Sequence, residues 1–510
     1  MKAFIRKHQQ IISLLLTFGA LRLSFIAKGH FFWIDELRFT NAFLFYDALG
    51  QGDIKQAGWY LFHAHGRPGF VLLSAIPAGI QLLLQKIGVI SLESPQFMEL
   101  LRRDQMTTGF NPHFFDVCGI FNILAGLAAA LLFFKILELF TNHKELPYIG
   151  VIIYSALVNT NFYIRHLVPY GMSLLFFLFP LYCVLKGIAR KSLNKKGAVA
   201  SGILSAFAFS VYPSYYLFVF MIAALFLLSP RGKITGFALH IFSFAVFTGL
   251  VESLSRWIGN SYIGSLRELS AIAIQGTFAE GYIFPLRYLI SVEGITGIAL
   301  IVLFFLFLGV VLRRSPAAVK AIYLTVAAGY FYHATSGVIF KKVVFYGRVL
   351  HMYFPFLVLA AVIFLDSIRN HRLRRRLSIL MAAVAVIGFI SFLKQYIPLN
   401  YPLDFRRDNI SRLPPGAVYS ANEQVLPDRS RIQNAQGVLV NAEYFHPIWP
   451  EWYPLETPSG MKLAAAAVHP LHFPAYQFEG HSLEDRQRLQ QRKIIMRFYV
   501  KEYLYDAFKK

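Results

Sequence analysis

Cysteine and charge are both scarce in this sequence. Cys118 and Cys183 are the only cysteines among 510 residues. Both stand in apolar stretches and are expected to be buried, so two such thiols support neither a disulfide framework nor a zinc site. Only 15% of the residues are Asp, Glu, Lys or Arg, and the 27 acidic residues are outnumbered by 50 Lys and Arg.

The resulting formal net charge of +23 could indicate a nucleic-acid partner. The basic residues, however, cluster in short loops between apolar segments, where membrane orientation and anionic lipids account for them. They have no groove-like or motif context of the kind that nucleic-acid-binding proteins show. We therefore expect membrane lipids, and no nucleic acid, among the partners.

Apolar runs fill most of the chain, which is 56% hydrophobic. Runs of roughly 20 apolar residues are typical of transmembrane helices. The first, 11–28, could be a signal peptide, but no small-residue cleavage site follows it and further runs do, so we expect a retained helix. The twelve segments are 11–28, 68–90, 114–140, 147–163, 167–186, 197–213, 214–229, 234–252, 291–312, 317–340, 348–367 and 377–396.

The basic loops decide how many of these segments cross the membrane. If the N-terminus is cytoplasmic and all twelve cross, the basic stretches 186–196, 231–233, 313–320 and 369–376 fall outside, against the positive-inside rule. The parity is restored if 68–90 does not cross. That segment contains Pro68, Pro77 and Gly79, and Ser74, Gln81 and Gln85 form a polar stripe, as in an in-plane interfacial helix.

The fold prediction is an all-α polytopic membrane bundle of about eleven transmembrane helices over residues 1–396. Its first external loop, 29–113, contains the in-plane helix, and 253–290 forms a second external loop with surface helices. The segments 197–213 and 214–229 turn at Tyr212-Pro213-Ser214-Tyr215. The chain is expected in a bacterial inner membrane, with a cytoplasmic N-terminus and a periplasmic C-terminus.

Composition changes after residue 396, where prolines and charged residues become frequent. Strand-like pieces at 416–419 and 437–440 and a charged helix near 483–508 predict a small external α/β domain over 397–510.

Candidate site residues gather at the predicted external helix ends. Asp35 and Glu36 follow the first span, where carboxylates are costly unless they are solvated, paired or used. Asp116, just inside its span, is a further candidate by the same principle. The remaining polar candidates are His63, His65, Arg67, Arg165, His166, Lys341, Lys342 and Arg348.

Three stretches carry a resemblance to a known family. They are Trp33-Ile34-Asp35-Glu36 with the long loop behind it, the turn Tyr163-Ile164-Arg165-His166-Leu167-Val168-Pro169-Tyr170, and Gly347-Arg348-Val349-Leu350-His351-Met352-Tyr353-Phe354-Pro355-Phe356. Here the chain resembles the C-type (GT-C) glycosyltransferase superfamily, such as protein O-mannosyltransferases, aminoarabinose transferases of lipid A and lipopolysaccharide galacturonosyltransferases. The resemblance covers about the first 190 residues and 341–367, and it does not extend to the C-terminal region.

The resemblance implies transfer of one sugar from a polyprenyl-phosphate donor to an envelope lipid, glycan or protein, with inversion and a periplasmic active site. It implies Asp35 as the base. A carboxylate can deprotonate an acceptor hydroxyl, and Lys and Arg can stabilise the leaving phosphate. No cofactor is required and no metal site is assigned, although a divalent metal is optional.

Each residue also has a plainer interpretation. Neighbours on a helix point about 100° apart, so Glu36 has a separate role from Asp35, orienting the acceptor or pairing with Arg38 or Arg67. The two carboxylates could instead be a solvated pair at a helix start.

The other candidates have plainer interpretations too. His63 and His65 could bind a metal, contact substrate or simply be polar loop residues. Arg165 and His166 could snorkel to lipid headgroups, Lys341 and Lys342 could bind anionic lipid, and Asp116 could hydrogen-bond within the bundle. We assign the donor phosphate to Arg348, and Lys135 and Glu138 to a local ion pair.

Two other functions fit a basic polytopic chain. A transporter or lipid-carrier flippase would place charges near the bilayer midplane and show paired halves with broken helices, which the sequence does not display. An envelope polysaccharide polymerase or ligase would not need the carboxylate pair after the first span. A catalytically inactive binding partner is a third alternative.

Overall fold

The computed structural model describes most of the helical region and parts of the C-terminal region. The described residues are 2–24, 33–62, 67–89, 116–165, 169–228, 233–271, 281–339, 347–396, 408–409, 411–414, 417–420, 429–441, 457–467 and 496–508.

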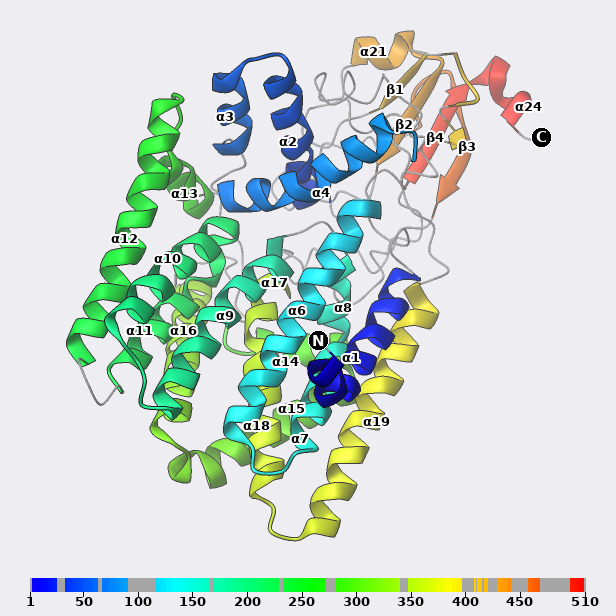
Figure 1. The fold of residues 1–510 in the computed structure, drawn as a ribbon. Coiled ribbons are helices and arrows are strands. Elements are labelled where there is room, and N and C mark those ends of the chain that lie inside the picture. Colours follow the sequence, from blue (N-terminus) through cyan, green and yellow to red (C-terminus); the bar gives the residue numbers. More distant parts are fainter. Residues whose placement is uncertain are drawn as a thin grey trace.

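A helical bundle forms the body of the protein (Figure 1). Its centre is α18, where Val358, Leu359 and Ala360 are fully buried. The bundle helices are α1 (Lys2–Leu23), α6 (Asp116–Phe140), α7 (Leu146–Ala156), α8 (Val158–Arg165), α9 (Pro169–Ala189), α10 (Lys195–Val211), α11 (Leu217–Phe226), α12 (Lys233–Trp257), α14 (Phe284–Glu293), α15 (Ile295–Leu306), α16 (Ala317–Ile339), α18 (Phe354–Ser367) and α19 (His371–Tyr396).

Seven helices among the described residues are long and apolar enough to cross a membrane. A chain with this many apolar helices is a helical membrane protein. The seven stretches are Pro68–Lys86, Val117–Phe140, Pro169–Ala189, Lys233–Trp257, Ile295–Arg314, Gly347–Ser367 and His371–Lys394, with shorter apolar helices at Gln9–Leu23, Leu146–Ala156 and Pro213–Phe226. The figure of eleven crossings therefore stays a prediction.

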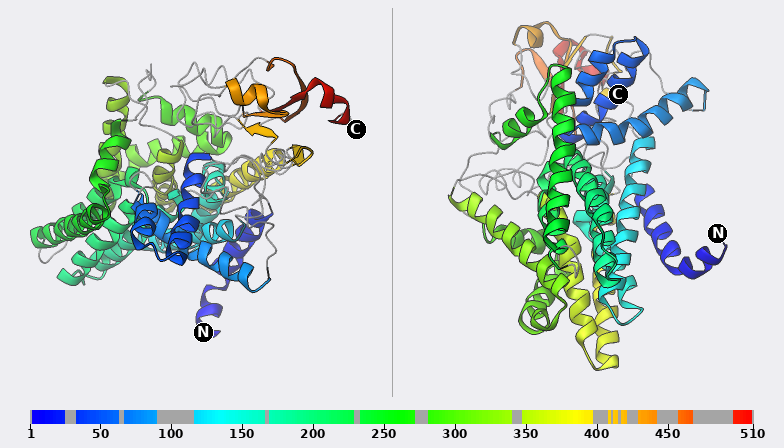
Figure 2. Two further views of the ribbon diagram at one scale, coloured as in Figure 1. Left: turned by 90° about the horizontal axis from the view of Figure 1, so that it is seen from above. Right: turned by 60° about the vertical axis from the view of Figure 1, so that its left-hand side comes forward.

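Three helices and the C-terminal sheet lie at one end of the bundle, which we call the sheet end (Figures 1 and 2). The helices are α2 (Trp33–Gly50), α3 (Ile54–Phe62) and α4 (Pro68–Lys86). Both figures show α4 running across the ends of the bundle helices. Buried Phe43 of α2 and Phe70 of α4 belong to one hydrophobic cluster, so these helices pack together as a unit.

The polar stripe of α4 faces the protein. Ser74 and Gln81 are buried, and the Cys118 thiol donates to Gln81 Oε1 at 3.7 Å. The exposed face of α4 consists of apolar residues, among them Leu72, Ile76, Ile80 and Leu83. The predicted stripe is therefore at least partly a packing face, because Ser74 and Gln81 lie against the protein, while Gln85 is half-buried. Whether α4 lies in the membrane plane stays a prediction.

The predicted span 147–163 is two helices, because the chain breaks between α7 and α8 at Leu157 (φ −60°, ψ 134°). The break exposes the first N–H groups of α8, which have no partner within that helix. The side chain of Glu293, the last residue of α14, is their partner. Its two carboxylate oxygens accept hydrogen bonds from the N–H groups of Val158 and Asn159, each at 2.8 Å. Gly294 then turns the chain into α15 with a φ of 56°, a conformation that favours glycine.

The region 253–290 differs from a loop with surface helices. Residues up to Trp257 continue α12, and α13 (Tyr262–Ala271) follows. The second helix, α14, is not a surface helix, because its Phe284 and Tyr288 are fully buried in the bundle. The turn at Tyr212–Tyr215 is confirmed: η2 (Pro213–Tyr215) separates α10 from α11.

The C-terminal region contains a four-stranded sheet of order β1-β2-β4-β3. The strands are β1 (Val418–Ser420), β2 (Gly437–Asn441), β3 (Met461–Ala467) and β4 (Met496–Lys501). β1 and β2 are parallel, and β4 is antiparallel to both β2 and β3. The two predicted strands are confirmed, and α21 (Arg429–Asn434) and α24 (Tyr505–Phe508) flank the sheet.

The charged helix expected near 483–508 is wrong over Met496–Lys501, which form a strand, whereas Tyr505–Phe508 at its end are helical. Residues Met496–Lys501 form β4, with Phe498 and Val500 buried in the sheet core between charged Arg497 and Lys501. Phe498 and Val500 are two residues apart and therefore share one face of the strand, and Tyr499 between them is buried as well.

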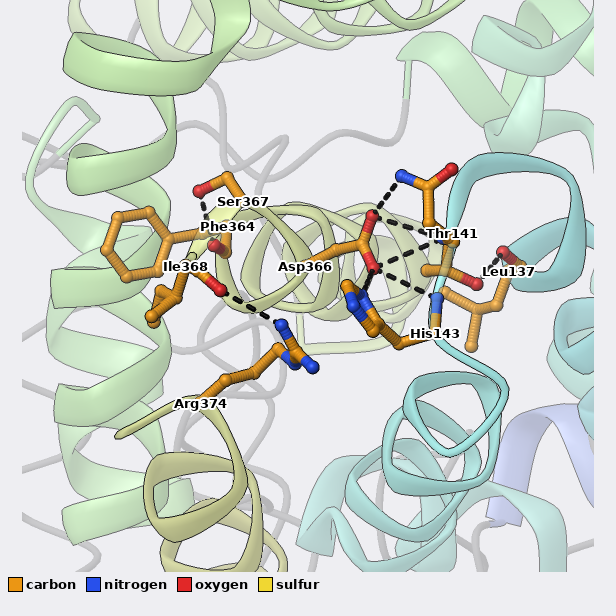
Figure 3. Close-up of polar contacts among 9 residues, drawn as sticks. Leu137, Thr141, His143, Phe364, Asp366, Ser367, Ile368 and Arg374 are labelled. Atoms are coloured by element: carbon orange, nitrogen blue, oxygen red, sulfur yellow. Dashed lines mark hydrogen bonds and ion pairs between the residues drawn. The ribbon is translucent and has the colours of Figure 1, made fainter. Parts of the chain in front are cut away.

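At the opposite end of the bundle, Asp366 closes α18 onto the turn between α6 and α7 (Figure 3). Its carboxylate accepts from the N–H groups of Asn142 and His143 and from Asn142 Nδ2 at 2.9 Å, and it lies 2.6 Å from His143 Nδ1. The predicted Lys135–Glu138 ion pair is confirmed at 2.7 Å. Cys118 is buried as expected, but Cys183 is exposed, so the expectation of two buried thiols is wrong.

Glu293→Ala should strongly destabilise the protein. It leaves two buried N–H groups without a partner, and each such group costs about 1–3 kcal/mol. We expect a lower midpoint of thermal unfolding for the purified protein in detergent, and a smaller loss for Glu293→Gln, which keeps one acceptor oxygen. Glu138→Ala removes only an exposed ion pair and should change stability by about 1 kcal/mol or less. Equal midpoints for Glu293→Ala and Glu138→Ala would refute the capping role.

Candidate functional site

Arg67 belongs to a cluster of polar and aromatic side chains at the sheet end. It precedes α4, whose first helical residue Pro68 has no N–H to satisfy. The Arg67 side chain is buried, and its guanidinium carbon lies 4.8 Å from the centre of the Tyr212 ring. A guanidinium over an aromatic face is a cation–π contact, which contributes more when desolvated.

The tyrosines around Arg67 lead directly to Arg348. The Tyr212 ring meets the rings of Tyr170 and Tyr215 edge to face, with centres 4.8 and 4.9 Å apart. Arg348 Nη1 donates to the Tyr170 hydroxyl at 3.3 Å. Two arginines that are far apart in the sequence thus flank one set of buried tyrosines, which we call the arginine–tyrosine cluster: Arg67, Tyr170, Tyr212, Tyr215 and Arg348.

Hydrogen bonds to the backbone fix the segment that carries Arg348. α17 (Gly347–Leu350) is a single turn. The Tyr215 hydroxyl donates to the Arg348 carbonyl at 3.0 Å, and Asn159 Nδ2 donates to the Gly347 carbonyl at 3.1 Å. Because two neighbouring carbonyls are held by α8 and η2, the position of Arg348 depends on both elements.

Asn159 is the centre of a buried polar network beside the cluster. Its Nδ2 also donates to the Tyr288 hydroxyl at 2.5 Å, and its Oδ1 lies 3.0 Å from His351 Nδ1. Glu293 holds the Asn159 backbone. This network joins α8, α14 and the segment of Arg348, so the start of α8 is linked through Asn159 to one part of the cluster.

The structure describes the other predicted residues only in part. Asp35 and Glu36 are in the first turn of α2, Asp116 is the first residue of α6 and Arg165 is the last residue of α8, but their side chains are outside the described residues. The predicted residues that lie wholly outside the described part are His63, His65, His166, Lys341 and Lys342. Of the predicted set, the structure therefore brings together Arg67 and Arg348.

The sequence interpretation missed the tyrosines and the polar network. Tyr170, Tyr212 and Tyr215 are all buried, although most aromatic residues of such a chain are expected to face lipid or the interface. One signal was present: Tyr212 and Tyr215 bracket the turn around Pro213, and Tyr170 follows Pro169 at the start of α9. Asn159 begins the polar run Asn159-Thr160-Asn161, and Glu293 is a carboxylate inside the predicted span 291–312, but neither is among the candidates of the sequence interpretation.

The cluster is suited to binding an oxyanion. Arginine presents several N–H donors in a fixed fork, and phenol hydroxyls can donate as well. Burial strengthens both kinds of contact because the local dielectric is low. Among the described residues no group of three His, Cys, Asp or Glu could hold a metal ion, and His63 and His65 are not among them.

Comparison with protein-family models, with curated proteins and with solved structures gives no match.

Gly69→Ala should disturb the position of Arg67. A Cβ at Gly69 would collide with the Ser210 hydroxyl at the end of α10 and would lie 3.0 Å from the Ser210 backbone carbon and from Val211 Cγ2, so α4 or Ser210 would have to shift. Overpacking of this kind typically costs about 1–3 kcal/mol. Gly249→Ala is the matched control, because Gly249 lies in α12 with open space around it. We expect a lower thermal midpoint for Gly69→Ala and an unchanged or higher one for Gly249→Ala. The same midpoint for both would contradict the close approach of α4 to α10.

Proposed function

We propose that this protein is an integral membrane glycosyltransferase of the C-type kind. It would move one sugar from a polyprenyl-phosphate donor to an envelope lipid, glycan or protein acceptor. The observation that carries the proposal is the arginine–tyrosine cluster, in which Arg67 and Arg348 flank the same buried rings. Such a site suits the phosphate that leaves during sugar transfer.

The proposed reaction is a single displacement. Asp35 takes the proton of the acceptor hydroxyl, and the hydroxyl oxygen attacks the anomeric carbon of the donor sugar. The bond between that carbon and the phosphate oxygen breaks, and the electron pair goes to the phosphate, which leaves as polyprenyl phosphate. Attack from the opposite face inverts the anomeric carbon.

Arg348 stabilises the charge that develops on the leaving phosphate. Its backbone is held by Tyr215 and its side chain by Tyr170, so it is positioned before the donor binds. Positioned donors of this kind need no rearrangement during the reaction. Arg67 supplies the second cation. In this proposal, neither the deprotonation of the acceptor nor the departure of the phosphate requires a metal, and a divalent ion is optional.

The remaining predicted residues are assigned to substrate binding. Glu36 orients the acceptor, and the residues that approach the donor or acceptor are His63, His65, Arg165, His166, Lys341, Lys342 and Asp116. The proposed location of the site is the periplasmic face of an inner membrane. The C-terminal sheet lies at the same end of the bundle as α2 and α4, where it would limit access of the acceptor.

Asp35→Asn should abolish sugar transfer without preventing membrane insertion, because the amide cannot act as the base. Mass spectrometry of envelope glycolipids, glycans and glycoproteins should show the loss of one sugar from a defined acceptor and accumulation of the polyprenyl-phosphate sugar. The comparison requires equal amounts of wild-type and variant protein in the membrane. An unchanged sugar inventory would remove Asp35 as an essential base and favour a transporter or a non-catalytic protein.

Arg348→Gln should reduce the rate of transfer by roughly 10²–10³-fold, the effect of removing one positioned donor. Arg348→Lys keeps the charge but loses the planar fork, so we expect an intermediate rate. Arg314→Gln is the control, because Arg314 is exposed and lies in the turn between α15 and α16. The assay is the turnover of purified protein with its donor and acceptor once the mass spectra have identified them. Equal rates for the Arg348 and Arg314 variants would exclude Arg348 from the site.

A further inference from the structure

A second basic site lies at the end of the bundle opposite the arginine–tyrosine cluster. A cavity of about 480 Å³ opens between the C-terminal ends of α6 and α9. The lining residues are Lys135, Glu138, Leu139, Tyr182, Lys186, Ala189 and Arg190. Tyr170 is in the first turn of α9 and Lys186 in its last turn, so the two sites are at opposite ends of one helix.

The cavity has an excess of positive charge. Glu138 pairs with Lys135 at 2.7 Å and offsets its charge. Lys186 lies over the Tyr182 ring at 5.2 Å, and among the described residues neither Lys186 nor Arg190 has a carboxylate partner. Two cations are therefore left for an anionic ligand.

Exposed apolar residues of α6 lead along the helix to this cavity. Ile120, Leu124 and Leu131 are exposed, and Lys135 and Glu138 continue the same series at spacings of four and three residues. Residues at these spacings share one face of a helix.

The neighbouring helix shows the same order. Phe179 of α9 is exposed, and Tyr182, Lys186 and Arg190 follow at spacings of three, four and four. Exposed apolar residues thus precede the charged residues of the cavity on both helices, as a series on α6 and as Phe179 on α9. Along the bundle axis, this surface therefore changes from apolar to charged. A membrane lipid shows the same order, from its acyl chains to its headgroup.

We propose that this cavity binds the phosphate headgroup of an anionic phospholipid, whose acyl chains lie along the exposed apolar faces of α6 and α9. The cavity is large enough for a headgroup, and the chains remain outside it. Basic pockets between transmembrane helices are a known form of lipid recognition. This site is separate from the proposed sugar transfer and does not depend on it.

Another role for these cations is structural. Lys186 and Arg190 lie at the C-terminus of α9, where positive charge stabilises the helix dipole. That role predicts a change in stability but no preference among lipids. A free phosphate ion would also be attracted to the cations, but it would make no use of the apolar faces.

Lipid binding can be measured by native mass spectrometry of the full-length protein in detergent, titrated with phosphatidylglycerol. We expect Lys186→Gln/Arg190→Gln to weaken binding of the first phosphatidylglycerol tenfold or more. The control Lys195→Gln/Lys196→Gln removes the same charge from exposed positions outside the cavity and should change binding less than threefold. Glu138→Gln removes the only carboxylate that lines the cavity, so it should tighten binding several-fold.

Four results would overturn the proposal. Equal weakening by both double variants would mean that the effect is one of net charge. Equal affinity of the wild-type protein for phosphatidylcholine and phosphatidylglycerol would mean that the headgroup charge is not recognised. Displacement of the lipid by inorganic phosphate at millimolar concentration would indicate a site for free anions. If only the thermal midpoint changed in Lys186→Gln/Arg190→Gln, the cations would serve the helix alone.

Discussion

The arrangement of the sheet end depends on how the break between α7 and α8 is satisfied inside the bundle. Inside the bundle of a membrane protein, an unpaired backbone group has no water with which to form a hydrogen bond, so leaving it unpaired is costly. Glu293 resolves this problem by accepting from the first two N–H groups of α8. The negative charge of the carboxylate is also stabilised by the helix dipole, because it lies at the N-terminus of the short helix α8. With α8 fixed in this way, the Asn159 side chain can reach three partners on α14 and on the segment of Arg348.

The arginine–tyrosine cluster follows from that framework. Arg348 is held through its own carbonyl and that of Gly347, while Arg67 is brought in by the close packing of α4 against α10. The rings of Tyr170 and Tyr212 belong to the hydrophobic core, and the Tyr212 ring gives Arg67 a polarisable surface. A buried charge such as that of Arg67 is expensive, and its contact with the Tyr212 ring offsets part of that cost. The half-buried Arg348 is held by the Tyr170 hydroxyl. The same contacts orient both side chains before any ligand arrives.

Much of the fold could be predicted from the lengths of the apolar runs in the sequence. Much of the site could not be predicted from the sequence. Long apolar runs predicted α6, α9 and α19, and the Pro213 turn predicted the change from α10 to α11. The break at Leu157 contains neither proline nor glycine, so periodicity gave one helix where two exist. The charges of Arg497 and Lys501 obscured the strand β4, which pairs with β2 on one side and with β3 on the other. Arg67 and Arg348 could be proposed singly, but their convergence depends on tertiary packing of α4, α9, α10 and α17.

The claim that Arg67 and Arg348 serve one ligand is tested most directly by a double-mutant cycle on the binding of polyprenyl phosphate. Binding would be measured for wild type, Arg67→Gln, Arg348→Gln and the double variant, all purified in detergent. Residues that share a ligand and a network show coupling energies of about 0.5–3 kcal/mol, and we predict a coupling in this range. Losses that add within about 0.3–0.5 kcal/mol, or no loss in either single variant, would contradict a shared phosphate site.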